Sequence, residues 1–172
     1  MNSQNKTCTI FLDIDGVLYP TRKRKAFLQD AKQIRLQYAH LNLDKIDDYS
    51  LLCVYEGWDM NAITYLKDVI LNNDCKIIVS SSWKFKYTYN TLKTLFLLHD
   101  INISGIVDNT YSILKSKAIP LYLKEHPEIK NYLVLDDAMM RTTFKNHFVY
   151  CPDVINEEVY KKIKKYLKKF NF

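Results

Sequence analysis

The sequence predicts an α/β domain built around a parallel, five-stranded sheet. Five short apolar runs are rich in strand-forming residues, and segments with helical periodicity lie between several of them. Strands that alternate with helices form parallel sheets with right-handed crossovers. Hydrophobic residues make up 48% of the 172 residues, with only 3 Gly and 4 Pro, which is enough for a substantial core. We therefore predict a single domain over residues 1–172.

Each apolar run predicts one strand, because Val, Ile, Phe and Tyr predominate in it. In chain order the predicted strands are Thr9–Ile14, Lys76–Ser80, Ser104–Val107, Tyr132–Asp136 and His147–Cys151. Four segments have apolar residues at helical spacing, and each predicts a helix. They cover Met60–Ile70, Thr91–Leu98, Ala118–Leu123 and Ile155–Phe170.

Residues 23–55 interrupt this alternation and predict a small, cap-like helical insertion after the first strand. The residues that repeat at helical spacing are Phe27, Ala31, Ile34, Tyr38 and Leu41, and Asn42–Ser50 is expected to be a polar turn. The segment is long for a plain loop. It either hangs over a site at the carboxyl end of the first strand or packs as decoration on the sheet edge.

The chain is basic, with a formal charge of +6 that is concentrated at Arg22–Lys25 and in the lysine-rich residues 161–169. A positive excess favours polyanionic partners, although the lysines near the end also fit the solvated face of an amphipathic helix. The four cysteines form no Cys-x-x-Cys pair, which is typical of a reducing compartment. No signal peptide is visible and no apolar stretch approaches 18 residues, so we expect a cytoplasmic protein without a membrane span.

Asp13 and Asp15 are the most informative residues, because both lie where the first predicted strand ends. Residues two apart on a strand share a face, so the two carboxylates should lie near each other. Such a pair is stabilised by a divalent metal, by a shared proton or by division into acid and base. Gly16 then permits a sharp turn. The competing interpretation is a strand-to-turn junction with two solvated acids.

Other predicted strands also deliver polar residues at their carboxyl ends, where open parallel sheets bind ligands. The second strand leads into Ser80, Ser81 and Ser82, and the fourth leads into Asp136 and Asp137. Lys115 and Lys117 lie between the third and fourth strands, before a helix. Carboxylates suit a hard divalent cation, whereas hydroxyl and ammonium groups suit a phosphoryl group.

Taken in order along the chain, these motifs resemble those of the haloacid dehalogenase (HAD)-like phosphohydrolase superfamily. The matching segments are Asp13–Val17, Val79–Ser80, Lys115–Ile119 and Leu135–Asp137. The set is most similar to the small HAD domain of Swiss Army Knife RNA repair-like proteins. The resemblance implies a Rossmann-like three-layer sandwich with strand order 3-2-1-4-5 and a phosphatase that acts on phosphate monoesters.

The resemblance also implies roles for the four aspartates. Asp13 would be the nucleophile that forms an aspartyl-phosphate, and Asp15 would be the general acid and then the general base. Mg²⁺ would be held by the Asp13 carboxylate, the Asp15 backbone carbonyl, and Asp136 or Asp137.

For the phosphoryl group, the resemblance implies a hydroxyl from Ser80 and the charge of Lys115. The run of serines leaves Ser81 as an alternative to Ser80, and Lys117 is an alternative to Lys115. Val17 stands where the family commonly has Thr.

Residues 83–89 interleave aromatic and basic side chains directly after the second motif. On a surface they could stack bases and follow a phosphate backbone, which suggests a nucleic-acid end as substrate. Alternatively, Trp83 and Phe85 are core anchors and the lysines face solvent. The partner is therefore expected to be a phosphorylated small molecule or a nucleic-acid end. Two functions of other classes stay open, a catalytically quiet phosphate- or nucleic-acid-binding module and a receiver-like signalling domain, although the phosphate-accepting aspartate of a receiver follows a later strand. A phosphotransferase of the same superfamily would differ mainly in the acceptor.

Overall fold

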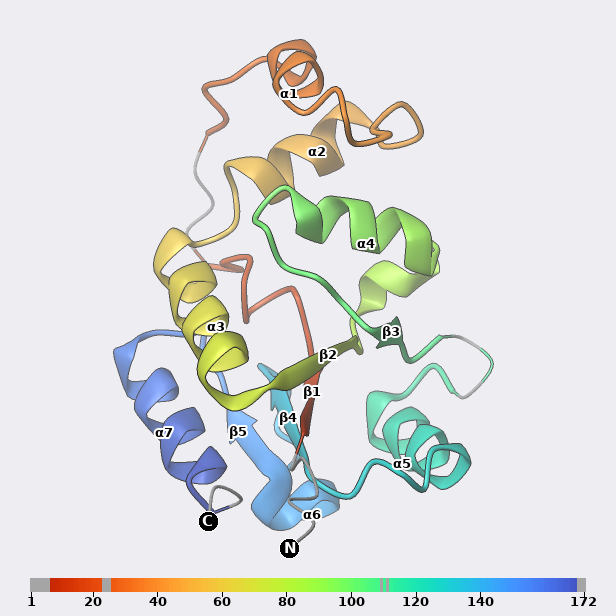
Figure 1. Ribbon diagram of the computed structural model, residues 1–172, viewed down its shortest axis with the longest axis vertical. Helices are drawn as coiled ribbons and strands as arrows, with labels where there is room; N and C mark the ends of the chain where they lie inside the picture. Colours follow the sequence, from red (N-terminus) through yellow and green to blue (C-terminus); the bar gives the residue numbers. More distant parts are fainter. Residues whose placement is uncertain (1–6, 23–25, 109, 111, 170–172) are drawn as a thin grey trace, which may run out of the picture.

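In the computed structural model, which describes residues 7–22, 26–108, 110 and 112–169, five parallel strands form one sheet (Figure 1). The strands are β1 (Cys8–Leu12), β2 (Cys75–Val79), β3 (Gly105–Ile106), β4 (Tyr132–Asp136) and β5 (Phe148–Tyr150). Their order is β3-β2-β1-β4-β5 and every pairing is parallel, which confirms the predicted fold class and strand order.

β1 lies at the centre of the sheet, and all five of its residues are buried. It pairs on one side with β2, with Leu12 opposite Val79, and on the other with β4, with Leu12 opposite Leu135. A strand covered on both faces has a nearly continuous apolar sequence, and Thr9 is the one polar residue of β1. The strand was predicted to reach Ile14, but it ends at Leu12. The carbonyl of Ile14 instead accepts hydrogen bonds from three following residues, and this turn closes the strand.

Helices cover both faces of the sheet and complete three layers (Figure 1). The first face carries α3 (Met60–Asn73), α4 (Tyr89–Leu97) and α7 (Glu157–Leu167), and the second carries α5 (Lys115–Glu125) and the short α6 (Arg141–Phe144). Two 3₁₀ turns, η1 (Ser82–Phe85) and η2 (Lys145–His147), follow β2 and α6.

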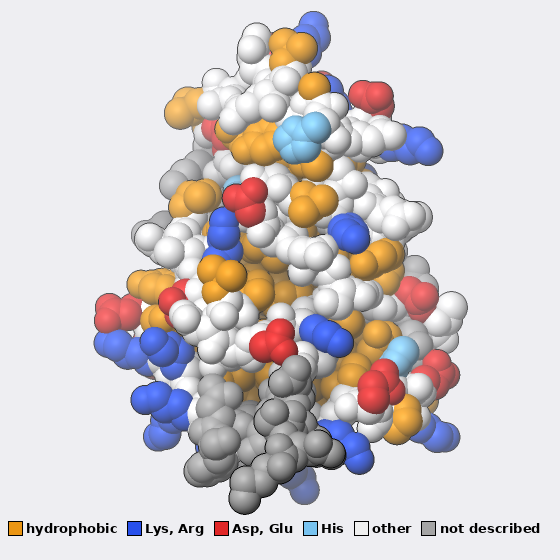
Figure 2. All heavy atoms as spheres, viewed as in Figure 1, with side chains coloured by type: hydrophobic (Ala, Val, Ile, Leu, Met, Phe, Trp, Pro, Cys, Tyr) orange, Lys and Arg blue, Asp and Glu red, His pale blue; other side chains and the backbone are white. Residues whose placement is uncertain are grey.

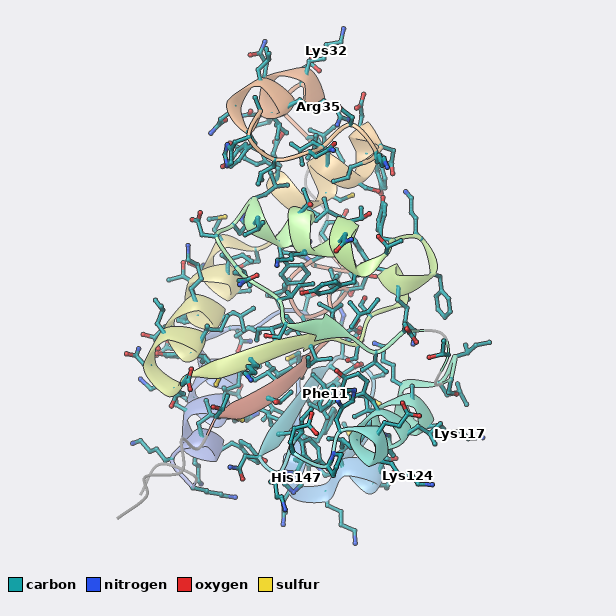
Figure 3. All side chains as sticks on the ribbon, turned by 45° about the vertical axis from the view of Figure 1, so that its right-hand side comes forward. Phe11, Lys32, Arg35, Lys117, Lys124 and His147 are labelled. Carbon is teal, nitrogen blue, oxygen red and sulfur yellow. The ribbon has the colours of Figure 1, made fainter. Side chains whose placement is uncertain are left out.

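The two apolar layers follow the alternation of side chains along β1. Ile10 and Leu12 belong to the larger cluster under α3, α4 and α7, and Phe11 points to the other face. Phe11 meets the rings of Tyr122 and Tyr132 edge to face, with centroids 5.8 and 5.9 Å apart, respectively. Figure 3 shows Phe11 between the sheet and α5.

The insertion contains two helices, α1 (Ala31–Gln37) and α2 (Asp48–Tyr55), at one end of the molecule (Figure 1). The prediction of one helix as far as Leu41 and of a polar turn over residues 42–50 was wrong at both ends. Asp47 caps α2 through the Ser50 amide at 3.0 Å, so the polar residues start a helix.

Arg35 of α1 explains why the connection between these two helices is ordered. Its guanidinium donates to the carbonyls of Leu43 and Ile46, the latter at 2.7 Å, and pairs with Asp48 at 2.6 Å. Tyr38, beyond the end of α1, still packs against the core, which accounts for the helix-like spacing of apolar residues in the sequence.

The lysine face of α7 lies in solvent, as an amphipathic helix requires. Figure 2 shows Lys, Arg and carboxylate side chains mixed along the flank where α7 lies in Figure 1. Lys161 pairs with Glu157 and Lys162 with Glu158, each at 2.6 Å. Phe170 and residues 23–25 of the other basic run lie outside the described residues. No helix among the described residues is long and apolar enough to cross a membrane.

Candidate active site

Three carboxylates meet at the carboxyl edge of the sheet. Asp13 follows β1, Asp136 ends β4 and Asp137 comes next, and their ligand oxygens all lie within 4.8 Å of one another. The register of β1 and β4 explains why these carboxylates lie close together. Leu12 pairs with Leu135, and the residue that follows each of them in the chain is an aspartate. Asp13 and Asp136 are buried, with 3% and 0% of their surface exposed. Buried carboxylate oxygens are a donor set that suits Mg²⁺.

Lys115, the first residue of α5, reaches into this cluster. Its ammonium donates to Oδ2 of Asp13 and, at 2.8 Å, to Oδ2 of Asp136. Burial alone would lower the pKa of Lys115, but the charges of Asp13 and Asp136 outweigh it and raise the pKa. Lys117, the alternative from the sequence, is exposed and points away from the sheet on the outer side of α5 (Figure 3).

The carboxylates remain crowded in spite of this lysine. Burial, followed by the charge of Asp13, raises the pKa of Asp136 to about 6, although Lys115 opposes the change. Burial and the same charge also raise the pKa of Asp137. Negative charge at this edge of the sheet therefore exceeds the positive charge of one ammonium group, and a divalent cation would offset it.

Ser80 and Ser81 follow β2 but face different surroundings. The Ser80 amide donates to the carbonyl of Leu12 at 2.8 Å, which places Ser80 next to the end of β1. Its hydroxyl is buried and has no hydrogen-bond partner among the described residues. The Ser81 hydroxyl accepts a hydrogen bond from the Trp83 amide at 3.4 Å and caps η1. Ser80 thus has a donor to offer a ligand, whereas Ser81 is used locally.

Asp15 is not one of the three clustered carboxylates, although its charge contributes to the raised pKa of Asp137. Its Oδ2 accepts a hydrogen bond from the indole Nε1 of Trp83 at 3.0 Å. The chain turns directly after Asp15 at Gly16, whose φ is +71°, and a Cβ at Gly16 would lie only 2.6 Å from the Cβ of Asp137. Glycine is therefore required by both conformation and space. The sequence did not reveal the partnership with Trp83, because 68 positions separate the two residues.

The position of the Lys84 side chain agrees with neither interpretation of residues 83–89 from the sequence. It is buried, and its ammonium donates to the carbonyls of Asp108 and Ser112 at 3.3 and 3.2 Å, across the loop before α5. Phe85, which could have been a core anchor, is 54% exposed. A run of alternating aromatic and basic residues gives no sign of which side chain turns inward.

The insertion reaches the site through α2. A pocket of about 280 Å³ opens between α2, η1 and the segment after β1, and Asp15 forms part of its wall. Together, the strand ends and the start of α5 offer a buried carboxylate, an ammonium, a donor hydroxyl and a second acid beside a cavity. This combination can bind a phosphoryl group and exchange a proton with an oxygen attached to it.

A comparison with family models gives one match. The model described as the HAD domain in Swiss Army Knife RNA repair proteins matches residues 9–155. The matched range includes every residue of the site described above. Comparisons with curated proteins and with solved structures gave no significant match.

Proposed function

The chain belongs to the family of HAD domains in Swiss Army Knife RNA repair proteins, whose general function is of the phosphohydrolase type, and we propose that it is a Mg²⁺-dependent phosphatase. Its substrate is a phosphate monoester on a nucleotide or a nucleic-acid end, and the reaction passes through an aspartyl-phosphate.

The environment of Asp13 is the observation that carries the proposal. This carboxylate is buried at the end of the central strand, is held by Lys115, and lies beside the strand end that presents the Ser80 hydroxyl. A buried carboxylate with a purely structural role needs only one positively charged or hydrogen-bonding partner. Two further acids next to it raise the electrostatic cost, which is typical of sites that bind a cation and an anion together.

Asp13, Asp136 and Asp137 would hold the Mg²⁺ ion, as the oxygen donors within 4.8 Å of one another suggest. When bound, the ion would offset negative charge on the carboxylates and on the phosphoryl oxygens. Lys115 contributes a second positive charge from the side of α5.

The chemistry of this chain's own residues divides into two steps. First, an Asp13 carboxylate oxygen bonds to phosphorus, the ester P–O bond breaks, and the leaving oxygen takes a proton from Asp15. Then Asp15 takes a proton from water, the water oxygen bonds to phosphorus, and the bond from phosphorus to Asp13 breaks to release phosphate. Ser80 and Lys115 bind the phosphoryl oxygens in both steps.

Asp13→Asn tests the nucleophile, because the amide keeps the size of the side chain and cannot form the acyl phosphate. We expect hydrolysis of a chromogenic phosphate ester in Mg²⁺ to fall at least about a thousandfold, while the far-UV circular dichroism spectrum stays unchanged. Asp44→Asn, at an exposed position in the insertion, is the matched control and should keep full activity. Activity retained by Asp13→Asn would mean that another residue attacks phosphorus.

The substrate is tested by comparing phosphate release from end-phosphorylated oligonucleotides, mononucleotides and sugar phosphates. We expect the highest kcat/KM for the oligonucleotide or mononucleotide and no turnover in EDTA. Equal or better turnover of sugar phosphates would contradict a nucleic-acid substrate. Binding of these esters without any turnover by the wild type would instead favour the alternative, a catalytically quiet binding module.

A further inference from the structure

The pocket beside Asp15 has walls that the proposed chemistry does not use. Its volume is about 280 Å³, near the lower end of the range for small-molecule sites. Aromatic rings supply much of the lining: Tyr19 from the segment after β1, Tyr49 from α2, and Trp83 and Tyr87 from η1 and the residues after it. A pocket of this size and lining fits one planar ring system.

The pocket's position relates it to the leaving group. Asp15 is the acid that protonates the leaving oxygen in the proposed reaction, and its carboxylate forms part of the pocket wall. The phosphoryl-binding groups, Lys115 at the start of α5 and Ser80 at the end of β2, do not line the pocket. An ester with its phosphorus at Asp13 would therefore extend its alcohol portion past Asp15 into this space.

The charge of the lining argues for a neutral group in the pocket. Lys86 is the cation among the described lining residues, and it is paired with Asp47 at 2.7 Å and donates to the Ser50 hydroxyl at 2.9 Å. The hydrogen bond to Asp47 raises the pKa of Lys86 to about 12. Because Asp47 already offsets this charge and Asp15 adds a negative one, a second phosphate would gain little here, whereas an uncharged ring would bury apolar surface.

Two of the rings are fixed in place. The indole of Trp83 is held through its bond to Asp15 at 3.0 Å, and the hydroxyl of Tyr87 donates to Asp47 at 2.7 Å. Tyr49 is 58% exposed, and its ring meets Phe27 edge to face with centroids 5.9 Å apart. A large exposed aromatic residue at the mouth of an aromatic pocket suits stacking on a ligand.

We propose that this pocket is a nucleobase subsite, in which the terminal nucleoside of the substrate stacks on Tyr49 and Trp83 while its phosphate lies at Asp13. The inference rests on the proposed phosphatase function and adds the part of the substrate that the insertion recognises. Base–aromatic stacking contributes about 1–3 kcal/mol per base, which corresponds to roughly a 5- to 150-fold change in affinity.

The test compares adenosine 3′- and 5′-monophosphates with ribose phosphates that carry the phosphate at the same position. The leaving oxygen is the same within each pair, so only the base differs. We expect the wild type to prefer the nucleotide at least about fivefold in kcat/KM. Tyr49→Ala should reduce this preference, because it should lower kcat/KM for the nucleotide more than for the ribose phosphate, while Tyr49→Phe should retain the preference. Leu71→Ala, at an 80% exposed position on α3, is the control for loss of an exposed apolar side chain.

Binding separates a failure of the subsite from a failure of the proposed function. Isothermal titration calorimetry of the Asp13→Asn variant with the same four esters in Mg²⁺ requires no turnover. Tighter binding of nucleotides, lost with Tyr49→Ala, would support the subsite even if the wild type hydrolysed no ester. Equal binding of nucleotides and ribose phosphates, or a Tyr49→Ala effect of the same size on both, would overturn it.

Discussion

The side chain of Trp83 contacts both the proposed general acid, Asp15, and the proposed nucleobase subsite. Its Nε1 donates to Asp15 at 3.0 Å, and its ring lines the pocket. The two roles can be separated, because phenylalanine keeps an aromatic face and has no N–H group.

Trp83→Phe should lower kcat about tenfold and change KM for a nucleotide less than about threefold. The carboxylate of Asp15 would lose the hydrogen bond that orients it, which costs about 1–3 kcal/mol for a charged acceptor. Steady-state kinetics on adenosine monophosphates measures both parameters. A rise in KM with unchanged kcat would show that Trp83 acts only as a stacking surface.

At the residue scale, the sequence could predict which side chains stand at strand ends. Asp13, Ser80 and Asp136 were found because an apolar strand stops where a polar residue follows, and parallel strands share one carboxyl edge. The structure also separates Lys115 from Lys117, since Lys115 donates to the carboxylates whereas Lys117, in the same first turn of α5, is exposed. The bond from Trp83 to Asp15 could not be predicted, because it depends on how a 3₁₀ turn aims a side chain.

At the element scale, Lys84 fastens the loop that leads to α5. α5 begins at Lys115 without a side-chain cap, so the position of Lys115 depends on the preceding loop. Lys84 donates to carbonyls at both ends of residues 108–112. Burial lowers the pKa of Lys84, the charge of Asp108 opposes this, and Lys115 adds to the lowering.

Lys84→Met should destabilise the protein by about 1–3 kcal/mol, because two carbonyls lose their donor, and should reduce kcat by displacing Lys115. Thermal unfolding and kinetics check the two effects. Lys117→Met, at an exposed lysine of α5, is the control for loss of a lysine charge and should change neither. If Lys84→Met lowers Tm and leaves kcat intact, the loop does not position Lys115.

The insertion shows why element boundaries were harder to predict than element types. Apolar spacing continued from α1 to Leu41, but those later residues pack against the core from a loop. In the same way, the polar residues before α2 suggested a turn, whereas Asp47 acts there as an N-cap. Periodicity reports which residues face the core, and caps decide where a helix begins.

At the scale of the whole molecule, His99 joins the insertion to the main layers. Its Nε2–H donates to the carbonyl of Val54 in α2 at 2.8 Å, and its ring stacks on Trp58 with centroids 5.4 Å apart. Burial lowers the pKa of His99, Lys67 adds to this, and the Val54 hydrogen bond and Asp100 oppose it. The folded state therefore favours the neutral ring.

This contact predicts a loss of stability in mild acid. A histidine whose pKa is depressed on folding leaves stability intact above its unfolded pKa of about 6.5 and reduces it as pH falls below that value. At pH 5.5 the largest possible loss is about 1.4 kcal/mol, or roughly 3–6 °C in Tm. His99→Gln keeps a donor without titrating, so its Tm should fall less than that of the wild type between pH 7.5 and 5.5. Parallel Tm profiles would show that His99 does not contribute.

The layered fold could be predicted as a whole because its signals repeat. Each β–α unit independently indicates a parallel sheet, so errors of one or two residues at strand ends leave the topology unchanged. The pocket between α2 and η1 had no such repeated signal. Its lining comes from segments far apart in the sequence, and Lys86 and Tyr87 contact the insertion there by binding Asp47.

The central place of β1 affects the order in which the molecule can assemble during translation. The strand nearest the amino end gains its first neighbour only when residues 75–79 have been made, and its second only after residues 132–136. A growing polypeptide on the ribosome thus carries an unpaired, mostly apolar edge until residues 132–136 have been made. Such an edge is what a nascent-chain chaperone would meet, and early truncation should give aggregates instead of a smaller folded unit.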